Sequence, residues 1–462
     1  MKGANVSKPN SQAAARCDTH TGNLLLDFYD RLPDVISACV DDVAPVRDDA
    51  AFSPGFALPE LSNAVKEFLS AGAVRWHAVG TYRGRRISIL DLAGNPATHT
   101  TKTYASLLIV ARAAEYIRRT GEHIMIFSPT SANKGVALRD AVLRALRTGI
   151  VRAEQLRIVT LVPRSGREKL RADPLSADAG HRALNPVLLY TGTDPEAVKT
   201  LGRDFVTRYG ATVRRDLGVN VWYSLQLRNY LIADTTRAFF EHRVDPPEKT
   251  ARTRVHAHAV SSAFGLLGYH QGRSLLEDAG EADPRARPST LLVQHLSTPD
   301  MVLSLTRSRV PRYTLDSATA LYRQEADPHF PEVTYDPDEV LDPTFYTRRP
   351  ATSAAMNELI GRFGGDGIVV SLAECVSRYP HLRRLVAEAL PLPADFRTLR
   401  EWSLVMVLTG VFNAIDRGLI GDGQDVVVHG SGSYTSADYY PMERADLTPV
   451  GTEADIAGAL LG

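Results

Sequence analysis

The segment from Thr103 to Gly149 reads TYASLLIVARAAEYIRRTGEHIMIFSPTSANKGVALRDAVLRALRTG. In its first and last parts the apolar residues recur with helical spacing, whereas HIMIFS between them is a short apolar run typical of a buried strand. Two more runs of this kind, RIVTLVP and PVLLYTG, follow along the chain. Strands and helices that alternate at this spacing predict an α/β fold with mostly parallel sheets and right-handed crossovers.

The alternation extends in both directions from this segment. On the N-terminal side, RWHAVGTYRGRRISILDL predicts a two-stranded hairpin, preceded by a helical stretch over residues 24–43 and a loose polar tail over residues 1–22. On the C-terminal side, TRVHAHAV, STLLVQHL and DVVVHG predict strands, and LREWSLVMVLTGVFNAIDRGLI predicts a long helix. Residues 323–353 are crowded with Pro, Asp and Arg, which fits either a lid or an inert surface excursion.

The composition excludes several classes of protein. The 462 residues leave room for two domains or two lobes, and 53 Lys and Arg balance 53 Asp and Glu, so no net field would attract nucleic acid or an anionic membrane. No run of about 18 apolar residues predicts a membrane span. The three cysteines, Cys17, Cys39 and Cys375, are too widely spaced for a disulfide framework and indicate a reducing compartment. We therefore expect a cytoplasmic protein.

One lysine stands out in the stretch NPATHTTKTYAS, residues 95–106. Lys102 lies among small hydroxyl residues at the predicted start of a helix, where a positive charge opposes the helix dipole. A lysine that forms a Schiff base with an aldehyde cofactor, or that moves protons as a free amine, would explain this position. A solvated surface lysine is the alternative.

Three further loops, each rich in small polar residues, follow predicted strands. SPTSANKG (128–135) offers backbone N–H groups at a helix start and the amide of Asn133, or it is an ordinary helix cap. AVSSAFGLLG (259–268) suits a phosphate held by amides and hydroxyls, or it is a plain turn. HGSGSYTSAD (429–438) lacks the third glycine of a dinucleotide fingerprint, which argues against NAD binding.

In their order along the chain, these loops resemble those of the fold-type II pyridoxal-phosphate enzymes, most closely the threonine synthases. That family has NP-x-x-(S/T)-x-K, then (S/T)-x-x-N before a helix, then a small-residue phosphate loop, then a terminal strand with G-x-G. RIVTLVPRSGREKL and VVVHGSGS resemble linking segments of the same family, and the resemblance extends from about Ile87 to Ser436. It implies two lobes with open, mostly parallel sheets flanked by helices, as in threonine synthase and the tryptophan synthase β chain.

The resemblance also implies a role for particular residues. Lys102 would be the catalytic Schiff-base lysine, and Asn133 would contact the 3′-oxygen of the pyridine ring. Residues 23–103 and 216–462 would form the large cofactor-binding domain and residues 104–215 a small α/β domain. The other cofactor-binding residues would be Ser261, Ser262, Ala263, Phe264 and Gly265 around the phosphate and His429 or Ser431 at the pyridine nitrogen, with Thr101, Thr130 and Ser131 binding substrate and no metal.

The sequence also departs from the family. Thr103 and Tyr104 replace the Asp-Arg that usually follows the lysine, and Ser-Ser-Ala-Phe-Gly stands where glycines and an Asn are expected. These departures bear on the reaction more than on the fold. We therefore keep two functional hypotheses. The first is a pyridoxal-phosphate-dependent lyase or synthase, a homodimer by resemblance, that acts on an amino acid by β- or γ-elimination or replacement. The second is a catalytically altered or non-catalytic anion- or small-molecule-binding protein on the same scaffold.

A few other residues carry weaker signals. Lys134 is a rival for the Schiff-base role, although we expect it to point along its helix start. His256 and His258 share one face of a strand, which suits metal ligation only if a third ligand joins them, and structural histidines are the preferred interpretation. Tyr223, Gln226 and Arg228 either approach the substrate or belong to a surface helix.

Overall fold

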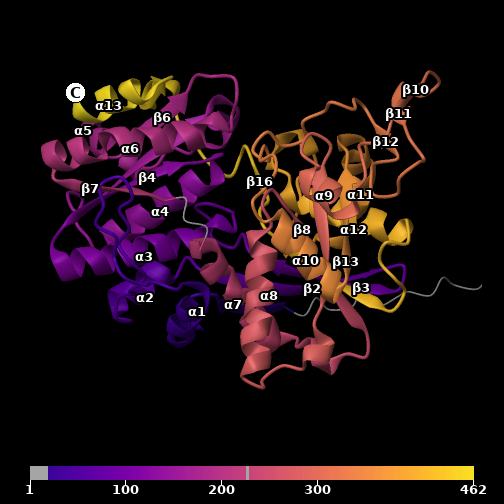
Figure 1. Ribbon diagram of the computed structural model, residues 1–462. Helices are drawn as coiled ribbons and strands as arrows, with labels where there is room; N and C mark the ends of the chain where they lie inside the picture. The colour runs from indigo at the N-terminus through magenta and orange to yellow at the C-terminus, as the bar shows by residue number, and fades with distance from the viewer. Residues whose placement is uncertain (1–18, 225–227) are drawn as a thin grey trace, which may run out of the picture.

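The computed structural model describes residues 19–224 and 228–462 and contains two large sheets surrounded by helices (Figure 1). The larger sheet has seven strands, and the five from β3 onward in its spatial order run parallel. The order is β1 (Thr19–Asn23), β2 (Ala73–Tyr82), β3 (Arg85–Asp91), β15 (Gln424–Gly430), β8 (Thr253–Ala259), β9 (Ser289–His295) and β13 (Gly365–Val370).

The second sheet has five strands, all parallel. Its order is β17 (Leu447–Val450), β6 (Val187–Tyr190), β5 (Leu156–Pro163), β4 (His123–Pro129) and β7 (Val219–Tyr223). Two short sheets complete the set: β10 (Thr314–Asp316), β11 (Leu321–Arg323) and β12 (Val333–Thr334) in one, and β14 (Leu399–Glu401) with β16 (Tyr434–Thr435) in the other.

Helices cover both large sheets. α12 (Ser403–Asp416) is buried along nearly its whole length and packs on β15, β8, β9 and β13, because its sequence is apolar on every face. α7 (Arg228–Val244) and α8 (Phe264–Asp278) pack closely on each other. The others are α1 (Leu32–Cys39), α2 (Asn63–Leu69), α3 (Lys102–Thr120), α4 (Asn133–Arg147), α5 (Ala179–Leu184), α6 (Ala197–Leu217), α9 (Asp300–Thr306), α10 (Ser353–Phe363), α11 (Leu372–Leu385) and α13 (Glu453–Leu461).

The predicted α/β fold with mostly parallel sheets is confirmed, as is the hairpin, which forms β2 and β3. Three local expectations differ from the structure. The last residues of the predicted tail, 19–22, belong to β1, because they pair antiparallel with β2. The second sheet takes β7 and β17 from outside residues 104–215. Of the helical stretch expected over residues 24–43, only α1 and a short 3-10 turn at Tyr29–Arg31 are helical. None of the helices in the described ranges is long and apolar enough to span a membrane.

Candidate active site

The loops that follow β3 and β15 meet at the C-terminal edge of the large sheet. The backbone N–H of Thr101 donates to the carbonyl of Ser431 (2.8 Å), and Thr100 forms an antiparallel bridge with Gly432. The loop after β4 of the other sheet reaches the same place, since its Asn133 bonds the side chain of Glu401 (2.6 Å). The strand ends of both sheets therefore face one region, which is where open α/β sheets bind ligands.

Lys102 is the first residue of α3 and extends from this edge. Its Nζ lies 5.2 Å from the centre of the Tyr230 ring. Burial lowers the pKa of the Lys102 amine below its usual value. The nearby Asp234 carboxylate opposes that shift, and the Arg237 guanidinium adds to it. A lysine amine with a lowered pKa loses its proton more readily and is a better nucleophile.

Lys134 points to the same ring and not along its own helix. Its Nζ is 5.9 Å from the centre of Tyr230 and donates to the carbonyl (2.8 Å) and hydroxyl (3.1 Å) of Ser224. Burial and the charge of Lys102 lower the pKa of Lys134 to about 7. The site therefore contains two amines whose pKa values are both lowered.

The amide of Asn133 is fixed from two sides. Its Nδ2 donates to Oε2 of Glu401 (2.6 Å), and its Oδ1 accepts from the hydroxyl of Tyr434 (2.7 Å). Only one of its two amide hydrogens is used in this way, and the other has no acceptor among the described residues. Asn133 therefore keeps one donor for a ligand.

The turn before Asn133 is strained. Ala132 has φ 128° and ψ −59°, a region that is natural only for glycine. The hydroxyl of Thr130, which is 5 % exposed, holds this turn by accepting from the N–H groups of Ala132 (3.2 Å) and Gly135 (3.1 Å). The Thr130 hydroxyl is thus used to hold the turn. The side chain of the neighbouring Ser131 is partly exposed.

The loop after β8 presents a row of backbone donors. The N–H groups of residues 261–265 donate to no acceptor within the described part of the chain, and the loop leads into the 15-residue helix α8. Ser261 and Ser262 are partly exposed, and Ala263 adopts the left-handed conformation (φ 49°, ψ 16°). Unpaired N–H groups at the start of a helix form a typical anion site.

The last two residues of this loop face the protein interior. The Phe264 ring stacks on Tyr230 with a centroid distance of 5.8 Å, beside the two lysine amines. Gly265 lies directly on Arg237: a Cβ added at this glycine would come within 2.3 Å of Nη1 of the arginine. The guanidinium therefore lies immediately beneath the loop.

Arg237 is 1 % exposed and connects the loop to the lysine. Its Nη2 donates to the Thr101 hydroxyl (2.8 Å) and to the Asp234 carboxylate (2.5 Å). Its Nη1 lies 3.1 Å from Nδ1 of His429. Thr101, predicted to bind substrate, thus uses its hydroxyl to accept from a buried arginine.

His429 continues this buried chain of hydrogen bonds and is not open to a ligand. Its Nε2 lies 2.9 Å from Nδ1 of His256, whose Nε2 lies 3.2 Å from Oε1 of Glu241. Both ring nitrogens of His429 are therefore occupied, and burial together with His256 and Arg237 keeps its pKa well below the usual value. Ser431, two residues further on, has a hydroxyl with no partner in the described ranges.

The histidines of β8 are part of this network. His256 bonds His429 and Glu241, and the His258 ring stacks on that of His429 with a centroid distance of 5.3 Å. No group of three or more His, Cys, Asp or Glu in the described ranges is arranged to hold a metal ion.

A second buried cluster joins residues 323–353 to the site. Nζ of Lys169 contacts both carboxylate oxygens of Asp342 (3.0 and 2.8 Å), the Thr344 hydroxyl (2.9 Å) and Oε2 of Glu401 (2.8 Å). Lys169 follows β5, Asp342 and Thr344 belong to the excursion, and Glu401 also holds Asn133. The excursion is therefore anchored over the strand ends of the second sheet by buried ion pairs.

Two residues with weaker signals contact other parts of the protein. The Tyr223 hydroxyl donates to the carbonyl of Lys199 (2.7 Å), and Arg228 pairs with Asp41 at 3.6 Å. Gln226 lies outside the described residues.

Sequence reasoning missed several residues of the site, namely Lys169, Ser224, Tyr230, Asp234, Arg237, Glu241 and Glu401. For part of this group a signal existed. Asp234, Arg237 and Glu241 follow each other at spacings of three and four, so they share one face of a helix, and most of the residues around them are apolar. Charges on a face that should be buried indicate a paired network.

Comparison with solved structures shows which known proteins share this architecture. The structure of threonine synthase from Escherichia coli superposes with a TM-score of 0.55 at 12% sequence identity, covering 95% of this chain and 89% of that one. Threonine synthase from yeast gives a TM-score of 0.52 at 10% identity, covering 86% of this chain and 82% of that one. The chain therefore has the threonine synthase fold in a divergent sequence, as the resemblance implied.

Sequence comparison gives two further results. No curated protein sequence matches the chain. The sequence model of one family matches residues 20–461, nearly the full length. That family is described as a family of unknown function, DUF6002, and the chain belongs to it.

Proposed function

We propose that this protein is a pyridoxal-phosphate-dependent enzyme that acts on an amino acid by elimination or replacement at the β or γ carbon, with Lys102 as the residue that carries the cofactor. The observation on which this rests is the Lys102 amine, with its lowered pKa, at the same sheet edge as the unpaired N–H groups of residues 261–265. An aldehyde-reactive amine next to an anion-binding loop matches both ends of pyridoxal phosphate.

The remaining donors also fit this cofactor. The hydroxyls of Ser261 and Ser262 supplement the N–H groups around a phosphate, and the spare amide hydrogen of Asn133 suits a phenolate oxygen. Ser431 offers a free hydroxyl to the pyridine nitrogen, whereas both nitrogens of His429 are occupied. When bound, the cofactor would supply an electron sink that stabilises negative charge at the α carbon of the substrate.

The side chains of the protein then have distinct tasks. Nζ of Lys102, when it is not joined to the cofactor, would take the α-proton of the substrate. Nζ of Lys134, with a pKa of about 7, would exchange a proton with a leaving or entering group near neutral pH. Lys169 holds the Glu401 carboxylate in place, and Glu401 would in turn keep the amide of Asn133 oriented toward the cofactor. By family resemblance we extend the proposal to a homodimer, and from the widely spaced cysteines to a cytoplasmic one.

The second hypothesis, a protein that binds an anion or small molecule without catalysis, rests on one observation. Alanine occupies strained or left-handed positions at Ala132 and Ala263, in the two loops that would hold the cofactor. A loop that has diverged this far from the glycine-rich form could hold a different anion.

The test is the visible absorption of the purified protein with pyridoxal phosphate, followed by borohydride reduction and peptide mass mapping. We expect a reduced adduct on Lys102 that is absent from Lys102→Ala and retained in Lys134→Ala. An adduct on Lys134 alone would show that Lys134 in α4, and not Lys102 in α3, carries the cofactor. Absence of any adduct, together with thermal stabilisation by another phosphate compound, would favour the second hypothesis.

A further inference from the structure

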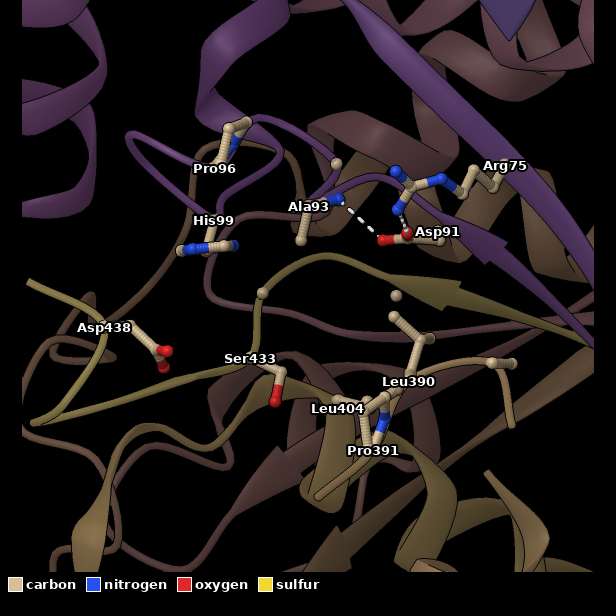
Figure 2. A pocket seen from close by; sticks show the side chains of 14 residues that line it. Arg75, Asp91, Ala93, Pro96, His99, Leu390, Pro391, Leu404, Ser433 and Asp438 are labelled. Atoms are coloured by element: carbon tan, nitrogen blue, oxygen red, sulfur yellow. Dashed lines mark hydrogen bonds and ion pairs between the residues drawn. The ribbon is translucent and has the colours of Figure 1, made fainter. Parts of the chain in front are cut away.

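A hollow opens beside the candidate active site. It has a volume of about 410 Å³ and lies at the C-terminal ends of β3 and β15, on the loops that follow them (Figure 2). Its lining includes His99, Gly430 and Gly432 but neither Lys102 nor any residue of the 261–265 loop. A volume in this range is typical of small-molecule sites, and the ends of parallel strands are where such sites occur.

One side of this cavity carries a charge pair with unused bonding capacity. Asp91 is 1 % exposed; its Oδ1 accepts from the backbone N–H of Ala93 (2.9 Å), but its Oδ2 is 3.6 Å from Nη1 of Arg75, which is too far for a hydrogen bond. Burial raises the pKa of Asp91, because it removes water from the carboxylate, and a bound cation would favour the ionised form. Arg75 is 46 % exposed, which leaves its guanidinium free to bind an anion.

An apolar group lies across the cavity from these charges. Figure 2 shows Leu390, Pro391 and Leu404 close together below the pair of Arg75 and Asp91, with His99 and Asp438 to one side. The site thus combines a carboxylate, a guanidinium 3.6 Å away and an apolar wall.

We propose that this cavity binds a free α-amino acid with an apolar side chain. Its ammonium group would take the open acceptor position on Oδ2 of Asp91, and its carboxylate would bind the guanidinium of Arg75. The side chain would pack against Leu390, Pro391 and Leu404. A zwitterion is the ligand that satisfies both charges: a plain anion would be repelled by the Asp91 and Asp438 carboxylates, and a plain amine would leave Arg75 without a new partner.

This site is separate from the proposed cofactor site and does not depend on it. The two nevertheless share a wall, because the loop that contains Ala93, Pro96 and His99 continues directly to Lys102. The bridge between Thr100 and Gly432 lies in that wall.

Isothermal titration of the full chain with L-leucine tests the proposal. The comparison ligands are 3-methylbutylamine, which lacks the carboxylate, and 4-methylpentanoate, which lacks the ammonium group. We expect leucine to bind and each comparison ligand to bind at least about tenfold more weakly. Asp91→Asn, which keeps the shape of the side chain, should weaken leucine binding by at least about tenfold as well.

Three further variants guard against misfolding and against binding elsewhere. Ala389→Trp fills the cavity from its partly exposed rim and should abolish binding, whereas Ala387→Trp, an exposed neighbour that does not line the cavity, should not. Lys102→Ala should bind leucine with unchanged affinity. The proposal is overturned if leucine binds no better than about 10 mM, if Asp91→Asn or Ala389→Trp binds it as well as the native chain, or if Lys102→Ala does not bind it.

Discussion

The amines of Lys102 and Lys134 approach one phenol ring, with their Nζ atoms 5.2 Å and 5.9 Å from the centre of Tyr230. They belong to different helices, α3 and α4, and come from loops that follow strands of different sheets. Two cations this close in a buried region disfavour each other's protonation. The pair therefore couples the protonation of a residue above one sheet to that of a residue above the other.

The lowered pKa of Lys134 predicts a pH dependence of stability. The folded protein has a pKa of about 7 at this lysine and the unfolded chain about 10.5, so between these values the unfolded chain binds more protons and stability rises with pH. Relative to Lys134→Met, the native chain should gain about 5 kcal/mol over this range. Urea unfolding of both proteins at pH 7, 8.5 and 10 measures the difference. A difference that does not change with pH contradicts the assignment.

Glu241 predicts a loss of stability in acid. Burial alone would raise its pKa, but His256, Arg254 and Tyr269 together lower it from 4.5 to about 2. The resulting stabilisation is present above pH 4.5 and is lost as the pH falls toward 2. We expect the stability advantage over Glu241→Gln to shrink by about 3 kcal/mol between pH 6 and pH 2.5. A difference in the free energy of unfolding between the two proteins that stays the same from pH 6 to pH 2.5 would count against this.

Gly265 should not tolerate a side chain, because a Cβ there would lie 2.3 Å from Nη1 of Arg237. Gly265→Ala should destabilise the protein by about 2 kcal/mol, as overpacking of a buried site does. Gly361, inside α10, has nothing within 4 Å of an added Cβ, and Gly361→Ala should stabilise by up to about 1 kcal/mol. Thermal unfolding of the two variants provides the test, and equal effects would contradict the close contact.

Ala132 predicts a stabilising glycine. At φ 128° and ψ −59° the alanine is strained, so Ala132→Gly should stabilise by about 1 kcal/mol even though a buried methyl is lost. Ala137 lies in the interior of the same helix, and Ala137→Gly should destabilise by at least about 1 kcal/mol. Chemical denaturation of the pair decides the matter: a destabilised Ala132→Gly would mean that the turn is not strained.

Much of the fold was accessible from the sequence because its buried strands are short apolar runs between helices. HIMIFS, RIVTLVP, TRVHAHAV and DVVVHG all form strands. The strand β7 was missed because VNVWY follows α6 after one glycine, with no loop to mark a boundary. β17 was missed because its four residues have no periodicity and join the second sheet only by pairing with β6.

The site was partly accessible for a different reason. Lys102 and Asn133 could be named because each lies in a local pattern of residue types at a loop end. The ion cluster of Lys169, Asp342 and Glu401 leaves no local pattern, since Asp342 and Glu401 lie 173 and 232 residues after Lys169. Such groups are brought together only by the tertiary fold, and their charges are tolerated only because they meet there.

The place of β15 in the large sheet has a consequence for biosynthesis. β15 lies between β3 and β8, and β17 forms an edge of the second sheet, yet both come from the last forty residues of the sequence shown here. During translation, β3 and β8 emerge from the ribosome long before the strand that joins them. The large sheet must therefore wait, with the edges of β3 and β8 open, until β15 has emerged, and this interval is when the protein most needs protection from aggregation.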